Sequence, residues 1–180
     1  MILRYTAFVA EKVEVTRGAQ SELRCSIARS ARILADRWSV LIVRDAFRGV
    51  TRFSDFKSRL GIPSDILTTR LTKLVDSNVF ERRPYRDEGG RERFGYHLTE
   101  AGRALLPVLG ALVQWGDSYR ASEFGPSRIY RNAATGEPLR VAFVTESGEV
   151  VADADVEVTA GPGEPELVEP YRPGLASTSA

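Results

Sequence analysis

The feature that most limits the fold of this chain is a series of short segments between Cys25 and Tyr119 that are separated by turn and capping residues. Apolar residues recur at helical spacing in several of them, and turn or capping residues stand between them. Asp36 precedes the second segment, and Gly49 and Gly61 follow the second and third. The pattern predicts four short helices in succession. They cover residues 26–34, 37–47, 53–60 and 64–77.

The second of these helices is apolar around most of its circumference, which is typical of a central core element. Its apolar residues are Trp38, Leu41, Ile42, Val43 and Phe47. The third helix is short and ends at Gly61. We expect Ser64 to cap the fourth helix, which buries one stripe of side chains. The stripe consists of Leu67, Leu71, Leu74 and Val75.

The opposite face of the fourth helix carries small polar side chains, flanked by cations. Small polar groups let a helix approach base edges closely, and cations can contact the phosphates on either side. A surface helix of an unrelated protein has a similar composition, but its position after a short helix and a three-residue turn favours DNA recognition. The predicted contacts of this region are Arg52, Ser64, Asp65, Thr68, Thr69, Arg70, Thr72 and Lys73.

Residues 79–98 predict a hairpin with a turn at Asp87-Glu-Gly-Gly. Its arms are rich in arginine, and a hairpin that follows a recognition helix can reach the neighbouring backbone or minor groove. We expect wing contacts from Arg86, Arg91 and Arg93. Four acidic residues in the same segment leave a salt-bridged, exposed hairpin as the alternative.

Thr99 can cap a long final helix with a broad apolar surface, and Pro107 should kink it. The surface predicts a dimer interface, packing against the chain's own first helices, or both. Its residues are Leu105, Val108, Leu109, Leu112, Val113, Trp115 and Tyr119. Together these segments predict an α+β, mainly α fold. It is a winged helix-turn-helix with a long C-terminal dimerisation helix and a small C-terminal β extension.

Charge is distributed unevenly along the chain. Residues 1–120 hold 21 Lys+Arg and 14 Asp+Glu, whereas residues 121–180 hold 4 and 10. The basic part suits double-stranded DNA as partner. The longest apolar run, residues 40–43, is too short to span a bilayer, and the N-terminus lacks a secretory signal pattern, so we expect a cytoplasmic protein. One cysteine and one histidine cannot form a closed zinc site, and we expect neither metal nor cofactor.

The sequence predicts four parts. Residues 1–22 are an N-terminal extension, residues 23–120 the DNA-binding and dimerisation domain, residues 128–160 a small β extension, and residues 161–180 a disordered tail rich in Pro, Gly, Ser and Thr. The β extension is expected from alternating apolar residues around a turn at 146–148. These residues are Leu139, Val141, Phe143, Val150 and Val151.

Several segments in this order resemble the HxlR family of winged helix-turn-helix transcription regulators, over about residues 25–118. The matching segments are Cys25-Ser-Ile-Ala-Arg, Asp36-Arg-Trp-Ser-Val-Leu-Ile-Val-Arg-Asp, Arg52-Phe-Ser-Asp-Phe, Leu67-Thr-Thr-Arg-Leu and Tyr96-His-Leu-Thr-Glu-Ala-Gly. The resemblance implies a dimer, often a repressor, with Trp38 in the core, a recognition helix at 64–73, a wing at 86–93 and a dimer helix at 105–116. The chain departs from the family at Ser26, where proline is usual, and at Asp65, where a basic residue is usual.

The resemblance also implies that Cys25 is a sensor of oxidants, quinones or aldehydes. A cysteine at a helix N-terminus with arginines nearby favours the reactive thiolate. The alternative is a small buried apolar residue. A small-molecule effector is a further possible signal. We also weighed a winged-helix ligand-binding or protein-interaction module without specific DNA binding, and a thiol enzyme using Cys25 with His97; the sequence pattern does not favour an enzyme.

Overall fold

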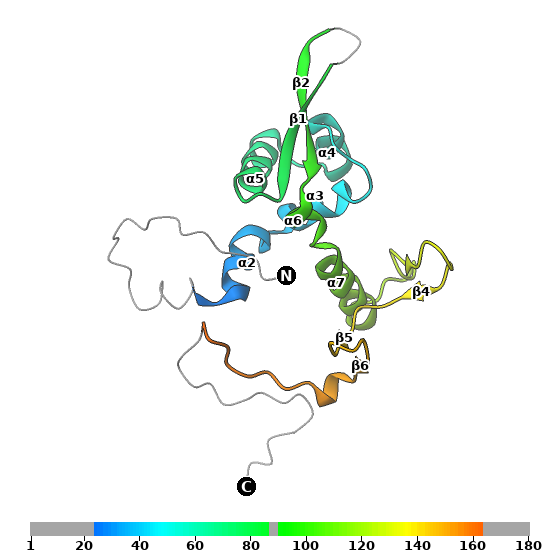
Figure 1. Ribbon diagram of the computed structural model, residues 1–180. Coiled ribbons are helices and arrows are strands. Elements are labelled where there is room, and N and C mark those ends of the chain that lie inside the picture. Colours follow the sequence, from blue (N-terminus) through cyan, green and yellow to red (C-terminus); the bar gives the residue numbers. More distant parts are fainter. Residues whose placement is uncertain (1–23, 87–89, 164–180) are drawn as a thin grey trace.

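A computed structural model describes residues 24–86 and 90–163. Expectations for the N-terminal extension, for residues 87–89 of the hairpin turn and for residues 164–180 of the tail lie outside the described residues. Helices and one hairpin form the body, and two further hairpins lie beside the last helix (Figure 1). The α+β winged helix-turn-helix fold expected from the sequence is confirmed.

Four helices follow one another before the first strand. They are α2 (Ser26–Leu34), α3 (Arg37–Ala46), α4 (Phe53–Leu60) and α5 (Ser64–Asp76). Their ends agree closely with the sequence pattern, because most caps are local. Asp36 accepts hydrogen bonds from the backbone N–H groups of Trp38 and Ser39, and Gly61 ends α4 in the left-handed region at φ 61°.

Helix α3 lies at the centre of the core. Ile42 and Val43 are fully buried, and α3 packs against α2, α4, α5 and the second strand. Phe56 from α4 meets Phe80 edge-to-face, with ring centroids 6.4 Å apart. The three leucines expected on the buried stripe of α5, Leu67, Leu71 and Leu74, are buried. Trp38 packs at the edge of this core.

The hairpin consists of β1 (Phe80–Arg86) and β2 (Glu92–Leu98), paired antiparallel with Phe80 opposite Leu98 and Arg86 opposite Glu92. Its base is fixed to the body, since the Tyr96 N–H donates to the Thr51 carbonyl over 2.8 Å. Its far end extends beyond α4 and α5 (Figure 1). This geometry is that of a wing.

The final helix is divided, whereas the sequence predicted one kinked helix. Thr99 caps the short α6 (Glu100–Arg103), two turn residues follow, and α7 (Leu106–Tyr119) continues. Pro107 lacks the N–H that a continuous helix would bond to the Arg103 carbonyl, and it occupies the first turn of α7, where that loss costs little. The proline therefore starts a new helix rather than bending an existing one.

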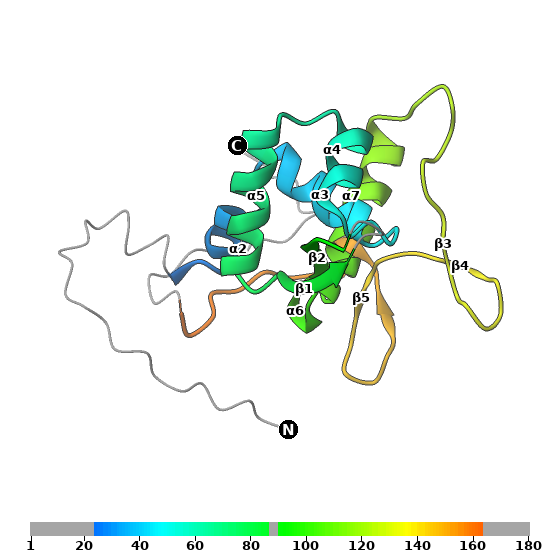
Figure 2. The same ribbon diagram turned by 90° about the horizontal axis from the view of Figure 1, so that it is seen from above.

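The C-terminal extension forms two separate hairpins, not one alternating unit. Strand β3 (Tyr130–Arg131) pairs with β4 (Pro138–Leu139), and β5 (Phe143–Val144) pairs with β6 (Val150–Val151). A short 3-10 helix, η1 (Asp153–Asp155), follows. Each hairpin has only two residue pairs and no core of its own, and both extend outward from the helices (Figure 2).

Candidate nucleic-acid interface

The exposed face of α5 carries most of the expected recognition residues. Ser64, Asp65, Thr68 and Thr69 are exposed, and Thr72 and Lys73 are half-buried. The hydroxyls of Thr68 and Thr69 donate to the carbonyls of Ser64 and Asp65 over 2.8 and 2.9 Å. These bonds fix the two side chains close to the helix surface and leave the hydroxyl lone pairs facing outward.

Ser64 does not cap α5, which corrects the expectation from the sequence. The helix already begins at Ser64, and Pro63 stands at the N-cap position in extended conformation. Its carbonyl accepts the Leu67 N–H over 2.9 Å. Proline fixes φ near the value that this position needs, so the turn after Gly61 enters the helix one residue earlier than a serine cap would. Ser64 therefore lies in the first turn, at the N-terminal end of the exposed face.

Arg70 lies on the flank of α5 that faces the body, unlike the other polar residues of this helix. Its Nε is 3.2 Å from Oδ1 of Asp36, with the two side chains 30% and 25% exposed. The contact is an ion pair only: the buried Nε of Arg70 makes no hydrogen bond, to Asp36 or to any other group. Arg70 thus connects α5 to the N-terminus of α3. The sequence analysis missed this link, since nothing in the local pattern pairs residues 34 positions apart.

The environment of Asp36 favours its charged form. Burial alone would raise the pKa of this carboxyl. Hydrogen bonds from the side chain and backbone of Ser39, the positive charge of Arg70 and the backbone N–H of Trp38 outweigh burial and hold the pKa below its ordinary value of 3.8. Asp36 therefore combines a helix cap with an ion pair between two helices.

Arg52 lies between the helices and the wing. It precedes α4, and its guanidinium stacks over the Tyr85 ring of β1 at 4.8 Å. The wing residues Arg86, Arg91 and Arg93 are all exposed, and Arg93 stands opposite Tyr85 in the ladder. The structure thus brings Arg52 near the outer half of the wing. On the inner half, Arg83 pairs with Glu81, as the salt-bridged alternative anticipated for part of the hairpin.

A buried carboxylate in α3 was not anticipated. The Asp45 side chain is 1% exposed and faces three arginines: Arg44 Nε at 2.9 Å, Arg48 Nη1 at 3.1 Å and Arg59 Nε at 3.7 Å. Burial lowers the pKa of Arg48, and the positive charges of Arg44 and Arg128 lower it further. The available signal was an aspartate on a largely apolar helix, with one arginine directly before it and another three residues after it. This cluster joins α3 to α4.

Cys25 occupies the N-cap position of α2. Its sulfur accepts the Ala28 N–H over 3.5 Å, and the side chain is half-buried. Arg29 turns back toward the same end of the helix, donating to the Arg24 carbonyl at 2.6 Å and to the Ser26 hydroxyl at 2.9 Å. Cys25 and His97 lie on different elements, α2 and β2.

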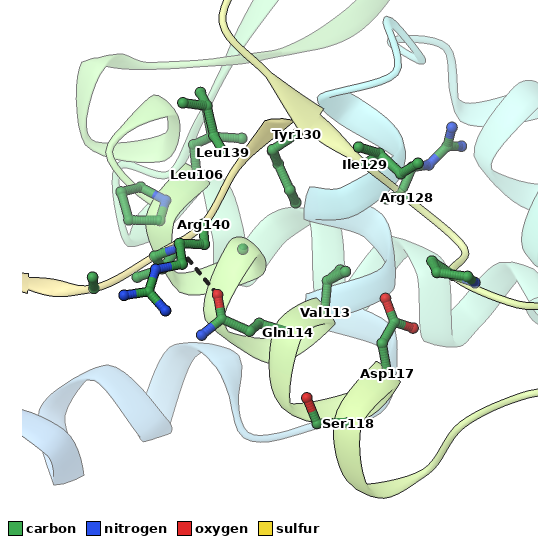
Figure 3. A pocket seen from close by; sticks show the side chains of 15 residues that line it. Leu106, Val113, Gln114, Asp117, Ser118, Arg128, Ile129, Tyr130, Leu139 and Arg140 are labelled. Atoms are coloured by element: carbon green, nitrogen blue, oxygen red, sulfur yellow. Dashed lines mark hydrogen bonds between the residues drawn. The ribbon is translucent and has the colours of Figure 1, made fainter. Parts of the chain in front are cut away.

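The seven residues expected at a dimer interface divide into three groups. Leu105 and Leu109 pack in the protomer's own core. Val113 lines a cavity beside the C-terminal hairpins (Figure 3). The other four, Val108, Leu112, Trp115 and Tyr119, are 46 to 66% exposed and recur at helical spacing on α7. We call these four residues the α7 stripe.

In the ranges 24–86 and 90–163, no three His, Cys, Asp or Glu side chains gather in a way that could hold a metal ion. Within the same ranges, no helix has the length and apolar character needed to cross a membrane.

Comparison with known proteins places this geometry in a family. Residues 33–124 match the family model of HxlR-like helix-turn-helix proteins. Rv3095 of Mycobacterium tuberculosis strain H37Rv, named an uncharacterised HTH-type transcriptional regulator, is 39% identical over 139 residues, which are 77% of this chain and 87% of the relative. YvaP of Bacillus subtilis strain 168, with the same description, is 32% identical over 106 residues, 56% of this chain and 92% of YvaP.

Two solved structures are similar along most of their length. PA1607, described as a candidate transcription factor, has 36% identity and a TM-score of 0.64, covering 76% of this chain and 95% of PA1607. PA1374 from Pseudomonas aeruginosa has 35% identity and a TM-score of 0.56, covering 79% of this chain and 96% of PA1374. The chain belongs to the HxlR family of winged helix-turn-helix transcription regulators.

Proposed function

We propose that this protein is a dimeric, sequence-specific DNA-binding repressor that acts in the cytoplasm and responds to a small-molecule or thiol-reactive signal. The single observation that carries the DNA-binding part is the exposed polar face of α5 beside an arginine-bearing wing. The family supports double-stranded DNA as partner. In this proposal α5 enters the major groove, and the wing contacts the flanking backbone or minor groove.

The residues of the interface have different roles in this proposal. Thr68, Thr69 and Thr72 read base edges, and Ser64 binds a phosphate near the N-terminus of α5. Asp65 repels phosphate and accepts a hydrogen bond only from a donor such as the amino group of cytosine, so it discriminates among sequences. Arg52, Lys73 and the wing arginines contact the backbone. Arg70 contributes through its ion pair with Asp36, which orients α5, rather than through the groove-facing side.

Dimerisation is proposed from the α7 stripe. Four large apolar side chains at helical spacing form a continuous exposed row, and Ile27 on α2 is 81% exposed. Rows of this kind on a small protein mark interaction surfaces. A two-fold pair would present two α5 helices to DNA and would add the affinity that one small module lacks.

Cys25 is the proposed thiol-reactive group. Its sulfur lies where the N-terminal end of α2 favours negative charge, and it is partly accessible. Oxidation or alkylation would break the hydrogen bond that the Cys25 sulfur accepts from the Ala28 N–H and would alter the start of α2. We expect this change to weaken DNA binding. A disulfide would require a second thiol from another molecule, because Cys25 is the only cysteine in the chain.

The decisive experiment is a salt titration of binding to the DNA upstream of the protein's own gene. Wild type should bind this DNA more tightly than random duplex, and the affinity should fall steeply with salt. Arg91→Ala should reduce the slope of log affinity against log salt by about 0.9 for one lost phosphate contact. Arg131→Ala, an exposed arginine on β3, is the matched control and should leave the slope unchanged.

A base contact gives a different result from a phosphate contact. Thr68→Ala should lower affinity for the specific DNA by about 1–3 kcal/mol and leave binding to random duplex nearly unchanged. If wild type shows no preference over random duplex, the repressor proposal is wrong. The exposed Asp65 and the Glu81–Arg83 pair would then support a winged-helix module that binds a ligand or a protein instead.

A further inference from the structure

A cavity of about 610 Å³ lies between α7 and residues 126–142 of the C-terminal extension (Figure 3). Its volume is in the range of sites for small organic molecules. Most of its wall is apolar, formed on one side by Leu106, Pro107 and Val113 and on the other by Ile129, Leu139 and Val141. The cavity therefore suits the apolar body of a ligand.

The extension is attached to α7 by specific contacts at one edge of this cavity. The Val141 N–H donates to Oε1 of Gln114 over 3.1 Å. At Gly110 the Val141 side chain packs closely on the α7 backbone, since a Cβ there would lie 2.8 Å from Cγ2 of Val141 and 4.0 Å from the Tyr130 ring. The wall opposite α7 is thus held in place by a glycine contact and a side-chain amide rather than by a core of its own.

Asp117 supplies the polar feature of the cavity. Its carboxylate comes from the last turn and a half of α7, is half-buried and points toward the lining residues in Figure 3. Among the described residues, it forms no hydrogen bond or ion pair. A half-buried carboxylate in an apolar wall is stabilised by a cation or a hydrogen-bond donor that arrives with the ligand.

The two arginines of the lining do not balance this charge inside the cavity. In Figure 3 the guanidinium groups of Arg128 and Arg140 point toward the outer edge of the view, away from the Asp117 carboxylate. Both residues are exposed, so solvent and salt screen them more strongly than they screen Asp117. The charge that a bound molecule meets at the end of the apolar cavity is therefore negative.

We propose that this cavity binds a compact aromatic or aliphatic amine, with its apolar body between α7 and the extension and its protonated nitrogen on the Asp117 carboxylate. The regulatory meaning of this site rests on the proposed function, in which it receives the effector. Binding of the amine itself does not require DNA. The proposal thus names the place and the chemical class of the signal molecule.

Helix α7 connects the cavity to the proposed dimer interface and to the base of the wing. The lining residues Gly110, Val113 and Asp117 lie on roughly the opposite side of α7 from the α7 stripe, given 3.6 residues per turn. A ligand and a second protomer can therefore contact α7 at the same time. Toward the wing, only α6 and two turn residues separate α7 from Thr99, which hydrogen-bonds to the Val79 and Asn78 carbonyls at the base of β1.

Three naphthalene derivatives that differ only in the head group test the assignment. Isothermal titration of the full chain without DNA should give one site per chain for 1-naphthylmethylamine, with affinity at least tenfold higher than for 1-naphthalenemethanol and higher still than for 1-naphthoic acid. Asp117→Asn should reduce the affinity for the amine about tenfold and leave that for the alcohol unchanged. Asp55→Asn, an exposed aspartate on α4, is the matched control and should behave as wild type.

A second variant removes the space instead of the charge. Val113→Trp should abolish binding of the amine and the alcohol, with unfolding in urea showing that the chain remains folded. Failure of wild type to bind the amine, tighter binding of the acid than of the amine, or an unchanged amine affinity in Asp117→Asn would each overturn the proposal.

DNA measurements separate this inference from the proposed function. Saturating amine should change the affinity of wild type for its specific DNA at least tenfold and leave Asp117→Asn unaffected. An amine that binds without this effect overturns the effector role of the cavity. A wild-type protein that binds no specific DNA overturns the proposed function, while the titrations without DNA still decide whether the cavity takes an amine.

Discussion

Replacement of Asp36 by alanine should destabilise the protein by about 2–3 kcal/mol, because one carboxylate serves three partners. It accepts two backbone N–H groups at 3.0 Å, and loss of such a cap costs about 1 kcal/mol. It accepts the hydroxyl of Ser39 at 2.6 Å, and this fully buried hydroxyl would lose its acceptor at a cost of about 1 kcal/mol. The Arg70 ion pair, about one-third exposed, adds up to about 0.5 kcal/mol.

The matched variant is Asp36→Asn, which keeps an oxygen for the cap and loses the charge. It should cost about 1 kcal/mol or less, since asparagine caps helices nearly as well as aspartate. The assay is urea unfolding of both variants at one fixed protein concentration, because any dimerisation would make stability concentration-dependent. Equal losses for the two variants, or a loss below about 0.5 kcal/mol for alanine, would refute the threefold role of this carboxylate.

The same carboxylate predicts a pH dependence with a defined sign. The folded-state pKa of Asp36 is lower than its ordinary value of 3.8, so the folded protein binds fewer protons than the unfolded chain at this site. The contribution of Asp36 to stability is therefore fully present above the ordinary pKa and is lost as the pH falls through the lower folded-state pKa. The difference in unfolding free energy between wild type and Asp36→Asn should shrink over that acidic interval.

Four further predictions concern packing, the buried charge, the dimer and the thiol. Gly102→Ala should lower the free energy of unfolding in urea by about 3 kcal/mol or more, because the added Cβ would clash with the Val79 carbonyl oxygen. Gly61→Ala should lower it by only about 1–2 kcal/mol, because it strains the left-handed backbone without a clash. Asp45→Asn should cost about 1–2 kcal/mol, because three arginines that are 27 to 50% exposed lose the buried carboxylate they face, and a loss below about 0.5 kcal/mol would contradict that account. Leu112→Asp on the α7 stripe should convert the proposed dimer to monomer in light scattering, with Ser58→Asp on α4 unchanged. Cys25→Ser should keep DNA binding after treatment with diamide, and equal loss in wild type and variant would exclude this thiol as the sensor.

The sequence predicted what is decided locally. The bounds of α2 and α4 and the caps at Asp36 and Thr99 all depend on residues within one helical turn, and they are confirmed. The error at Ser64 was local too: serine is a common cap, but the preceding proline already had the dihedral angles of the cap position.

Long-range features lay beyond the sequence pattern. The contact of Arg70 with Asp36 depends on how α5 crosses α3, and periodicity carries no information on that crossing. The approach of Gly102 to the Val79 carbonyl likewise depends on how α6 docks against the base of the wing. The cavity beside α7 needed the placement of the β3–β4 hairpin, which has no core of its own and therefore no strong alternation to predict its packing.

The break between α6 and α7 has a consequence for how regulators of this architecture can diversify. In a two-fold dimer, the spacing and tilt of the two half-sites on DNA would follow from the direction in which α7 leaves the domain, whereas the bases recognised in each half-site would follow from α5. Ala104 and Leu105 form the turn between α6, which is docked at the base of the wing, and α7. Substitutions there would alter operator spacing and leave base preference intact, so the two properties can evolve separately.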